Sequence, residues 1–167
     1  MTGCVRTCNT LSDGRRQIGA FYLPGDVFGL DARKVHSISA EATTASNVVA
    51  VKRSALMSRN AGDAGMLRLL LDLTALELQR RQNHILLLLK NALERVAGFL
   101  LDLAKGRGGR SEIELPMSRQ DIADYLGLTI ETVSRTLTRL EAAAAIALPA
   151  ARRVVLRNRR ALMRMNS

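Results

Sequence analysis

The stretch PMSRQDIADYLGLTIETVSRTL, residues 116–137, decides the fold of the C-terminal third of this chain. Ser118 is followed three residues later by Asp121, a spacing that resembles the capping box of a helix N-terminus. Gly127 then stops the pattern after barely two turns. The spacing predicts a short helix that begins after Ser118 and ends at Gly127.

A second helix follows at once, with Thr129 as its predicted cap. Ala123 is small enough to let the two helices approach, Gly127 permits the tight turn, and Val133 fills the gap between them. Leu137 continues the buried face. The pair is therefore predicted to form a helix-turn-helix.

The surrounding residues extend this motif to a winged helix-turn-helix. Residues 112–115 alternate and end at Pro116, which favours a short edge strand. Residues 146–148 and 153–156 are apolar and flank Pro149-Ala-Ala, which predicts a hairpin, the wing. A short C-terminal helix is expected over 159–165.

The outward side chains near the start of the second helix suit base recognition. Glu131 can accept from a cytosine amino group, and Arg135 can donate two hydrogen bonds to guanine. Ser134 is small enough to approach a thymine methyl group or another base edge. The alternative is an exposed helix with an intrahelical pair between Glu131 and Arg135, which contributes about 0.2–0.5 kcal/mol. Without DNA the two interpretations are compatible.

The charge distribution favours a nucleic-acid partner. The 167 residues carry a formal net charge of +10, which suggests nucleic acid or an anionic membrane surface as the partner; a solvated basic surface is the alternative. From Arg135 onward there are eight basic residues and one acidic residue, whereas residues 111–134 hold one basic and five acidic. Arg152 and Arg153 fall near the wing tip, where phosphate contacts are expected. A membrane helix is disfavoured because these arginines lie on a hairpin and a very short helix.

Composition excludes several other classes. Aromatic residues make up only 3% and tryptophan is absent, which argues against base stacking on aromatic platforms. No apolar run is long enough to span a bilayer, and no secretory signal is visible. Cys4 and Cys8 fit a strand in a reducing cytoplasm better than a disulfide or a metal site. No catalytic or metal-ligating constellation occurs, and His36 and His84 are isolated, so we expect no enzyme and no cofactor.

A long helix is predicted from about residue 64 to 90, with two apolar stripes. One consists of Met66, Leu69, Leu73, Leu76 and Leu87, and the other of Leu67, Leu71, Leu78, Ile85 and Leu88. A helix that is apolar on two faces must bury both. We expect one face to pack on its own domain and the second stripe to pair with another copy in a parallel dimer; burial of both within one chain is the alternative. A further helix is expected over 92–104.

The N-terminal residues read as short strands and turns. Residues 4–8 and 17–23 each end at a turn signal, Ser12-Asp-Gly and Pro24-Gly-Asp. Further extended segments are expected over 27–30, 37–42 and 47–51, and a short helix over 54–59. Because so few residues bury little surface alone, this part needs another element or another chain.

Residues 116–137 resemble the DNA-binding signature of the CRP/FNR superfamily of bacterial transcription regulators, and the chain is most similar to its FixK-type members. Residues 17–31, with FYLPGDVFGL, resemble the middle of the family's sensor β-roll, and residues 64–90 resemble its dimerisation helix. The resemblance implies an α+β fold. Its parts are a partial cyclic-nucleotide-binding-like β-roll in 1–62, a dimerisation helix and a following helix in 63–105, and a winged helix-turn-helix in 106–167.

The resemblance also implies a function. Glu131, Ser134 and Arg135 fall where regulators of this type read TTGAT half-sites in an inverted repeat, while Ile130 replaces an additional arginine of the cyclic-AMP receptor protein. We expect a cytoplasmic homodimeric activator whose partners are double-stranded DNA and RNA polymerase. We do not expect it to bind a membrane. The expected phosphate contacts are Ser118, Arg119, Thr129, Thr132, Arg139, Arg152 and Arg153.

Three departures from the family pattern qualify these expectations. The stretches Gly29-Leu-Asp and His36-Ser-Ile-Ser lack the glutamate and arginine of a cyclic-AMP pocket. No cysteine follows Cys8, and Val49 lies about where a cluster ligand would fall, so no iron–sulfur cluster is expected. We also expect the sensor part to lack the family's first strands, either because the start of the chain is misassigned or because the natural protein is truncated. An alternative function is therefore a truncated interaction modulator that pairs with a full-length relative.

Overall fold

The computed structural model describes residues 3–30, 35–36, 38–52, 54, 56, 64–106 and 108–166. Its described strands are β1 (Val5–Thr10), β2 (Arg16–Tyr22), β3 (Ser39–Ala42), β4 (Glu112–Glu114), β5 (Ile146–Ala150) and β6 (Arg153–Leu156). Its described helices are α2 (Ala64–Leu88), α3 (Ala92–Lys105), α4 (Arg119–Leu126), α5 (Ile130–Ala142) and α6 (Arg159–Met165). The strands form two antiparallel sheets, ordered β2-β1-β3 and β4-β6-β5. The α+β class is confirmed.

The N-terminal half is a small antiparallel sheet. β1 and β2 form a hairpin whose register runs from Val5 opposite Tyr22 to Thr10 opposite Arg16, with an irregularity after Thr7. The predicted turn at Ser12-Asp-Gly is confirmed, and Gly14 adopts a φ of +81° there. β3 confirms the end of the predicted segment 37–42, of which Ser37 lies outside the described residues.

Two other predictions for this half were wrong. Residues 27–30 and 47–51 form no strand, because they run as loops without a neighbouring ladder. Of the short helix predicted over 54–59, Ser54 and Leu56 are helical and the other positions lie outside the described residues.

The long helix α2 packs on the rest of the chain through a face that matches the predicted stripe in part, at Met66, Leu73 and Leu87. Its less exposed positions recur every three to four residues and include polar side chains: Met66, Leu70, Leu73, Glu77, Arg80, His84 and Leu87. Leu69 and Leu76, placed in a packing stripe by the sequence, are 50% and 66% exposed. The polar members stay on the packed face because neighbouring elements offer them partners: Tyr22 donates to Glu77 at 3.0 Å, and His84 binds the Tyr125 carbonyl at 2.8 Å.

The C-terminal half holds the main core. α3 begins at Asn91, whose side chain accepts from the backbone of Leu93 and Glu94 in a capping box. The buried side of α3, including Val96 and Leu100, packs with residues of α4, α5, the second sheet and α6. β4 is an edge strand, as predicted, and the wing β5–β6 turns at residues 151–152.

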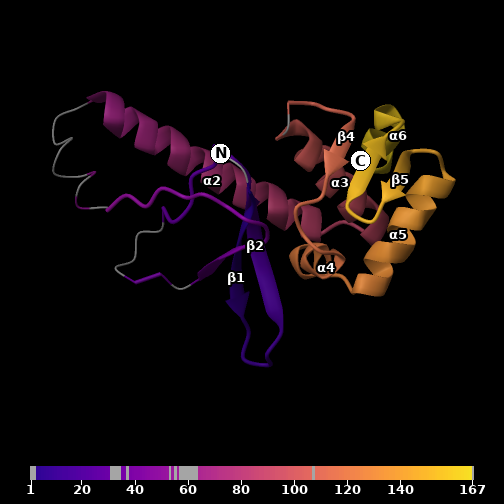
Figure 1. The fold of residues 1–167 in the computed structure, drawn as a ribbon, viewed down its shortest axis with the longest axis horizontal. Helices are drawn as coiled ribbons and strands as arrows, with labels where there is room; N and C mark the ends of the chain where they lie inside the picture. Colours follow the sequence, from indigo (N-terminus) through magenta and orange to yellow (C-terminus); the bar gives the residue numbers. More distant parts are fainter. Residues whose placement is uncertain are drawn as a thin grey trace.

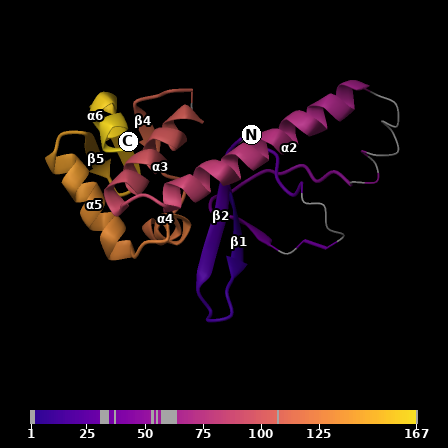
Figure 2. The ribbon, with the colours of Figure 1, turned by 180° about the vertical axis from the view of Figure 1, so that it is seen from behind.

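Figure 1 shows α2 extending away from this compact half, with the β1–β2 hairpin beside α4. The reverse view in Figure 2 shows the same arrangement, with α5 on the side of α4 away from the hairpin. The described helices include none that is both long enough and apolar enough to cross a membrane.

Candidate nucleic-acid interface

Local signals build the turn between α4 and α5. Ser118 accepts from the Asp121 amide at 3.1 Å, and the Asp121 carboxylate accepts from the Ser118 amide at 2.9 Å, which completes the predicted capping box. Gly127 has a φ of +61°, the left-handed conformation that glycine adopts without strain. The amide of Leu128 donates to the Ala123 carbonyl at 3.0 Å. The helix therefore ends where the sequence predicts.

The core side of the two helices sets the direction of α5. Ala123 and Val133 are fully buried where α4 and α5 pack, and Leu137 and Leu140 continue that buried face. Thr129 begins α5, accepting from the Thr132 amide at 3.2 Å. With one face fixed in the core, the opposite face of α5 is turned outward, as a reading helix requires.

All three predicted base-reading side chains are exposed on this outward face. The pKa of Glu131 is lowered, first by its own backbone amide at the helix start and then by the Thr129 side chain, so the group is an acceptor at neutral pH. Among the described ion pairs, Glu131 and Arg135 do not form one, although the charge of Arg135 also lowers the pKa of Glu131. The intrahelical pair considered as an alternative is thus not made.

Most of the predicted phosphate-contacting residues lie around the helix starts and the wing, and Arg139 lies at the end of α5. Ser118 and Thr129 cap α4 and α5, and the Thr132 hydroxyl lies 3.1 Å from that of Thr129. Arg139 is exposed on the last turn of α5. Hydroxyls and amides at helix N-termini, together with arginines, are the groups that usually bind phosphate.

The wing arginines differ in their surroundings. Arg152 is exposed in the turn itself. Arg153 lies within β6 and pairs with Glu112 of the neighbouring strand, Nε to Oε1 at 3.2 Å, with both side chains 59% exposed. Arg119 donates to the Ala151 carbonyl at 3.5 Å, and burial lowers its pKa. Arg119 thus joins the first helix of the motif to the wing, whereas Arg153 joins two strands of the sheet.

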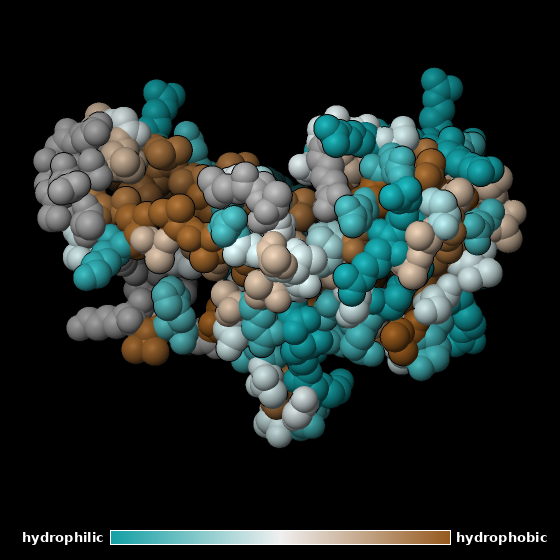
Figure 3. Space-filling view, viewed as in Figure 1, coloured by the Kyte–Doolittle hydropathy of each residue, from teal (hydrophilic) through white to brown (hydrophobic). Residues whose placement is uncertain are grey.

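The second apolar stripe of α2 is uncovered in the single chain. Leu67, Leu71, Leu78 and Ile85 are 57–62% exposed, and Leu88, nearer the compact half, is half-buried. In Figure 3 apolar surface gathers along α2 at the left, while hydrophilic side chains prevail over the helix-turn-helix half. Burial of both stripes within one chain, the other option left open by the sequence, does not occur in the described part of the chain.

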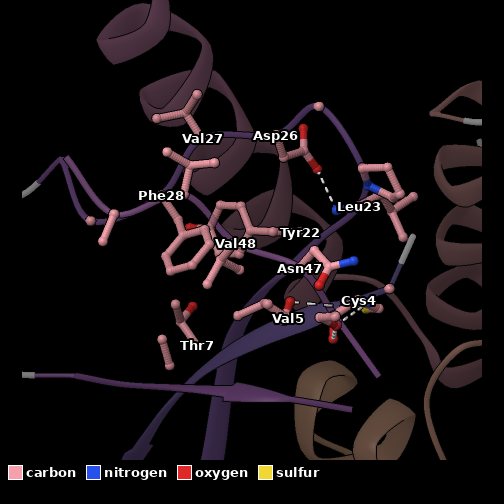
Figure 4. A pocket seen from close by; sticks show the side chains of 18 of the residues that line it. Cys4, Val5, Thr7, Tyr22, Leu23, Asp26, Val27, Phe28, Asn47 and Val48 are labelled. Carbon is pink, nitrogen blue, oxygen red and sulfur yellow. Dashed lines mark hydrogen bonds between the residues drawn. The ribbon is translucent and has the colours of Figure 1, made fainter. Parts of the chain in front are cut away.

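A half-open hollow of about 690 Å³ lies in the N-terminal half. Figure 4 shows Tyr22 and Phe28 in its wall, with ring centroids 5.1 Å apart, beside Val48 and the strand residues Val5 and Thr7. Its described lining is largely apolar and includes no arginine or glutamate. The sequence carries no local signal for this hollow, because segments distant along the chain enclose it.

Other residues missed by sequence analysis lie around α4. Arg6 and Arg16 bind its acidic side chains, and His84 and Arg95 bind backbone carbonyls at its C-terminal end. Each pairing joins residues more than 30 positions apart, so local spacing carries no signal for them.

Comparison with known proteins agrees with this geometry. Residues 94–165 match the Crp-like helix-turn-helix domain. The nitrogen fixation regulation protein FixK of Azorhizobium caulinodans is 53% identical over 173 residues, covering all of this chain and 70% of that protein. FixK of Rhizobium meliloti is 47% identical, covering 92% of this chain and 70% of the relative. The structure of FixK2 from Bradyrhizobium japonicum superposes with a TM-score of 0.89 at 46% identity, covering 99% of this chain and 84% of that one.

Matches of this identity and coverage, together with the winged helix-turn-helix and the long α2, agree with the resemblance carried by residues 116–137. They place the protein among regulators of transcription and not among enzymes. The chain belongs to the FixK-type branch of the CRP/FNR family of DNA-binding transcription regulators.

Proposed function

We propose that two copies of this chain pair through α2 and bind a palindromic DNA site made of inverted TTGAT-type half-sites. The observation that carries the proposal is the exposure of Glu131, Ser134 and Arg135 together on the outward face of α5. Each of the two copies reads one half-site, and two recognition helices about one DNA turn apart match the two-fold symmetry of the site.

The homodimer rests on the seam formed by Leu67, Leu71, Leu78 and Ile85. These residues recur at heptad-like spacing, and Thr74 and Arg81 occupy the intervening positions of the same stripe. Burying a leucine that is otherwise exposed contributes about 1.5–3 kcal/mol, and a symmetric pair counts each residue twice. A parallel pair of α2 helices also directs both DNA-binding halves to the same side.

The remaining contacts orient the protein on the duplex. Ser118, Arg119, Thr129, Thr132, Arg139, Arg152 and Arg153 bind phosphate oxygens from the helix starts and the wing. Activation follows by contact with RNA polymerase in the cytoplasm. The similarity to the relative named nitrogen fixation regulation protein FixK supports a role in the regulation of nitrogen-fixation genes.

A gel-shift titration with sedimentation analysis tests the proposal. The protein is expected to sediment as a dimer and to bind an inverted TTGAT repeat at least about 1,000-fold more tightly than a scrambled duplex of equal length. Equal affinity for the two duplexes would contradict the sequence-specific function. A monomer that binds DNA only when mixed with a longer relative would instead support the interaction modulator.

A further inference from the structure

The N-terminal end of α4 is held by two arginines of the β1–β2 hairpin. Arg16 donates to Asp124 Oδ2 from Nε and Nη2 at 3.1 and 3.0 Å, and to Asp121 Oδ1 from Nη2 at 3.0 Å. Arg6 forms an ion pair with the same Asp121 oxygen. Asp121 also completes the capping box of α4. The hairpin therefore forms ion pairs with a residue that stabilises the start of this helix.

The contact is part of a continuous ionic network. Glu41 of β3 accepts from Arg6 Nη2 at 2.6 Å, so acidic and basic groups alternate from Glu41 through Arg6, Asp121 and Arg16 to Asp124. The Arg6 side chain is 16% exposed and that of Asp121 is 6% exposed. Salt screens such shielded charges less than surface charges. Removal of Arg16 would leave the Asp124 carboxylate, whose side chain is 14% exposed, without this ion pair, which is unfavourable.

The C-terminal end of α4 is fixed by residues of α2 and α3. His84 Nε2 donates to the Tyr125 carbonyl at 2.8 Å, and Arg95 Nη1 donates to the Leu126 carbonyl at 2.8 Å. The Tyr125 ring also packs against Phe21 of β2, with centroids 5.3 Å apart. Both ends of α4 are therefore attached to elements outside the helix-turn-helix.

These attachments leave the reading face free. The hairpin meets α4, whereas Glu131, Ser134 and Arg135 are exposed on α5, which lies on the other side of α4 (Figures 1 and 2). A clamp that blocked DNA would cover the outward face of α5. This clamp, formed by Arg6 and Arg16 on Asp121 and Asp124, instead joins the motif to the hairpin.

We propose that Arg6 and Arg16 are positioning residues for DNA recognition: by holding α4 against the hairpin, they fix the separation of the two reading helices in the dimer. The inference rests on the proposed function, because separation has meaning only for paired reading helices. With the clamp intact, each dimer fits one half-site spacing. Without it, each DNA-binding half samples several orientations, and the fraction of dimers ready to bind falls.

The test compares affinities for duplexes whose central spacer is lengthened or shortened by one and two base pairs. The variant is Arg16→Ala. The matched control is Arg15→Ala, which removes the same charge from the same hairpin but whose arginine, with a side chain 79% exposed, pairs with Asp13 in its own turn. Affinity for a duplex with a single half-site measures base recognition by one reading helix, which does not depend on the separation of the two helices.

For Arg16→Ala we expect affinity for the native spacing to fall about 5-fold and preference over altered spacings to flatten by about the same factor. Single-half-site affinity should stay within about 2-fold, and Arg15→Ala should match the wild type throughout. If Arg16→Ala does not fold, Asp124→Asn, which loses one charge on α4, is expected to flatten the same preference.

Unchanged spacing preference in Arg16→Ala or Asp124→Asn would overturn the positioning role. Equal loss on the palindrome and on the single half-site would also overturn it, because that pattern indicates general damage to the domain. If the wild-type protein prefers no palindrome over a scrambled duplex, the proposed function itself is contradicted. The wild-type titration alone gives this result, so it is distinguished from a failure of the positioning role.

Discussion

The imidazole of His84 lies flat on the ring of Tyr125, with ring centroids 4.0 Å apart and planes 5° from parallel. The same imidazole binds the Tyr125 carbonyl through Nε2 at 2.8 Å. Burial raises the pKa of Tyr125 to about 12, so its hydroxyl stays neutral over the working range of pH. One side chain of α2 thus contacts both the ring and the backbone of the first helix of the DNA-binding motif.

His84 makes the stability of the chain sensitive to acid. Burial lowers the pKa of His84 in the folded chain, whereas an unfolded imidazole titrates near ~6.5. Between the folded and the unfolded pKa, the unfolded chain binds more protons than the folded chain. The contribution of His84 to the free energy of unfolding is therefore full above pH ~6.5 and is lost as pH falls through the folded pKa. We expect His84→Phe, which keeps the stack but loses the hydrogen bond, to cost about 1 kcal/mol at pH 7.5. Its stability should also fall less than that of the wild type between pH ~7 and ~5.5. Parallel stability curves from denaturant titrations would contradict this.

Gly127 is required by backbone conformation and not by space. A Cβ at this position would lie 3.5 Å from Arg95 Nη1, an ordinary contact, but the φ of +61° is strained for an L side chain. Gly127→Ala is therefore expected to lower the free energy of unfolding by about 1 kcal/mol. Gly106→Ala is the matched control, since Gly106 has a φ of −61° and room for a Cβ. Thermal unfolding that shows equal effects of the two substitutions would contradict this account.

Leu76 and Leu78 distinguish the predicted seam from the rest of α2. Both are exposed, at 66% and 57%, but two residues apart they lie on nearly opposite sides of the helix. Leu78→Asp is expected to raise the dimer dissociation constant by about 100-fold or more, because two buried leucines are lost per dimer. Leu76→Asp should leave the dimer intact in sedimentation velocity. Dissociation by Leu76→Asp alone would place the seam on the other face.

Arg153 tests the wing. In the free chain Arg153 pairs with Glu112 on the neighbouring strand, and DNA phosphate is expected to take that place. Arg153→Ala should weaken binding to specific and random duplexes alike and reduce the slope of log K against log salt by about 1.8, which is about 0.9 for each of the two arginines in the dimer. Glu112→Gln, which removes the competing carboxylate, should not weaken binding. An unchanged salt slope in Arg153→Ala would exclude the phosphate contact.

The helix-turn-helix could be predicted from the sequence because its signals are local. The cap at Ser118, the left-handed Gly127 and the plug at Val133 all lie within sixteen residues and need no distant partner. The same holds for the cap at Asn91 and the hairpin turn at Gly14.

The packed face of α2 could not be predicted in this way. Apolar periodicity assigned Leu69 and Leu76 to it, whereas the structure uses Glu77 and His84, whose partners Tyr22 and Tyr125 lie far along the chain. The grip of Arg16 on Asp121 and Asp124 escaped prediction for the same reason. A charged pair more than 100 residues apart follows from the assembled fold and leaves no periodic signal.

The most direct test of the central claim, that Glu131, Ser134 and Arg135 read DNA sequence, is a gel-shift titration of Arg135→Ala. An inverted TTGAT repeat and a scrambled duplex are compared in parallel, with Arg160→Ala as a charge-matched control on α6. We expect Arg135→Ala to lower the affinity for the repeat by at least about 30-fold, since two bidentate contacts at about 1–3 kcal/mol each are lost per dimer, and to change the affinity for the scrambled duplex little. Arg160→Ala should change the affinity for either duplex little. Equal losses by Arg135→Ala on the two duplexes would contradict the claim.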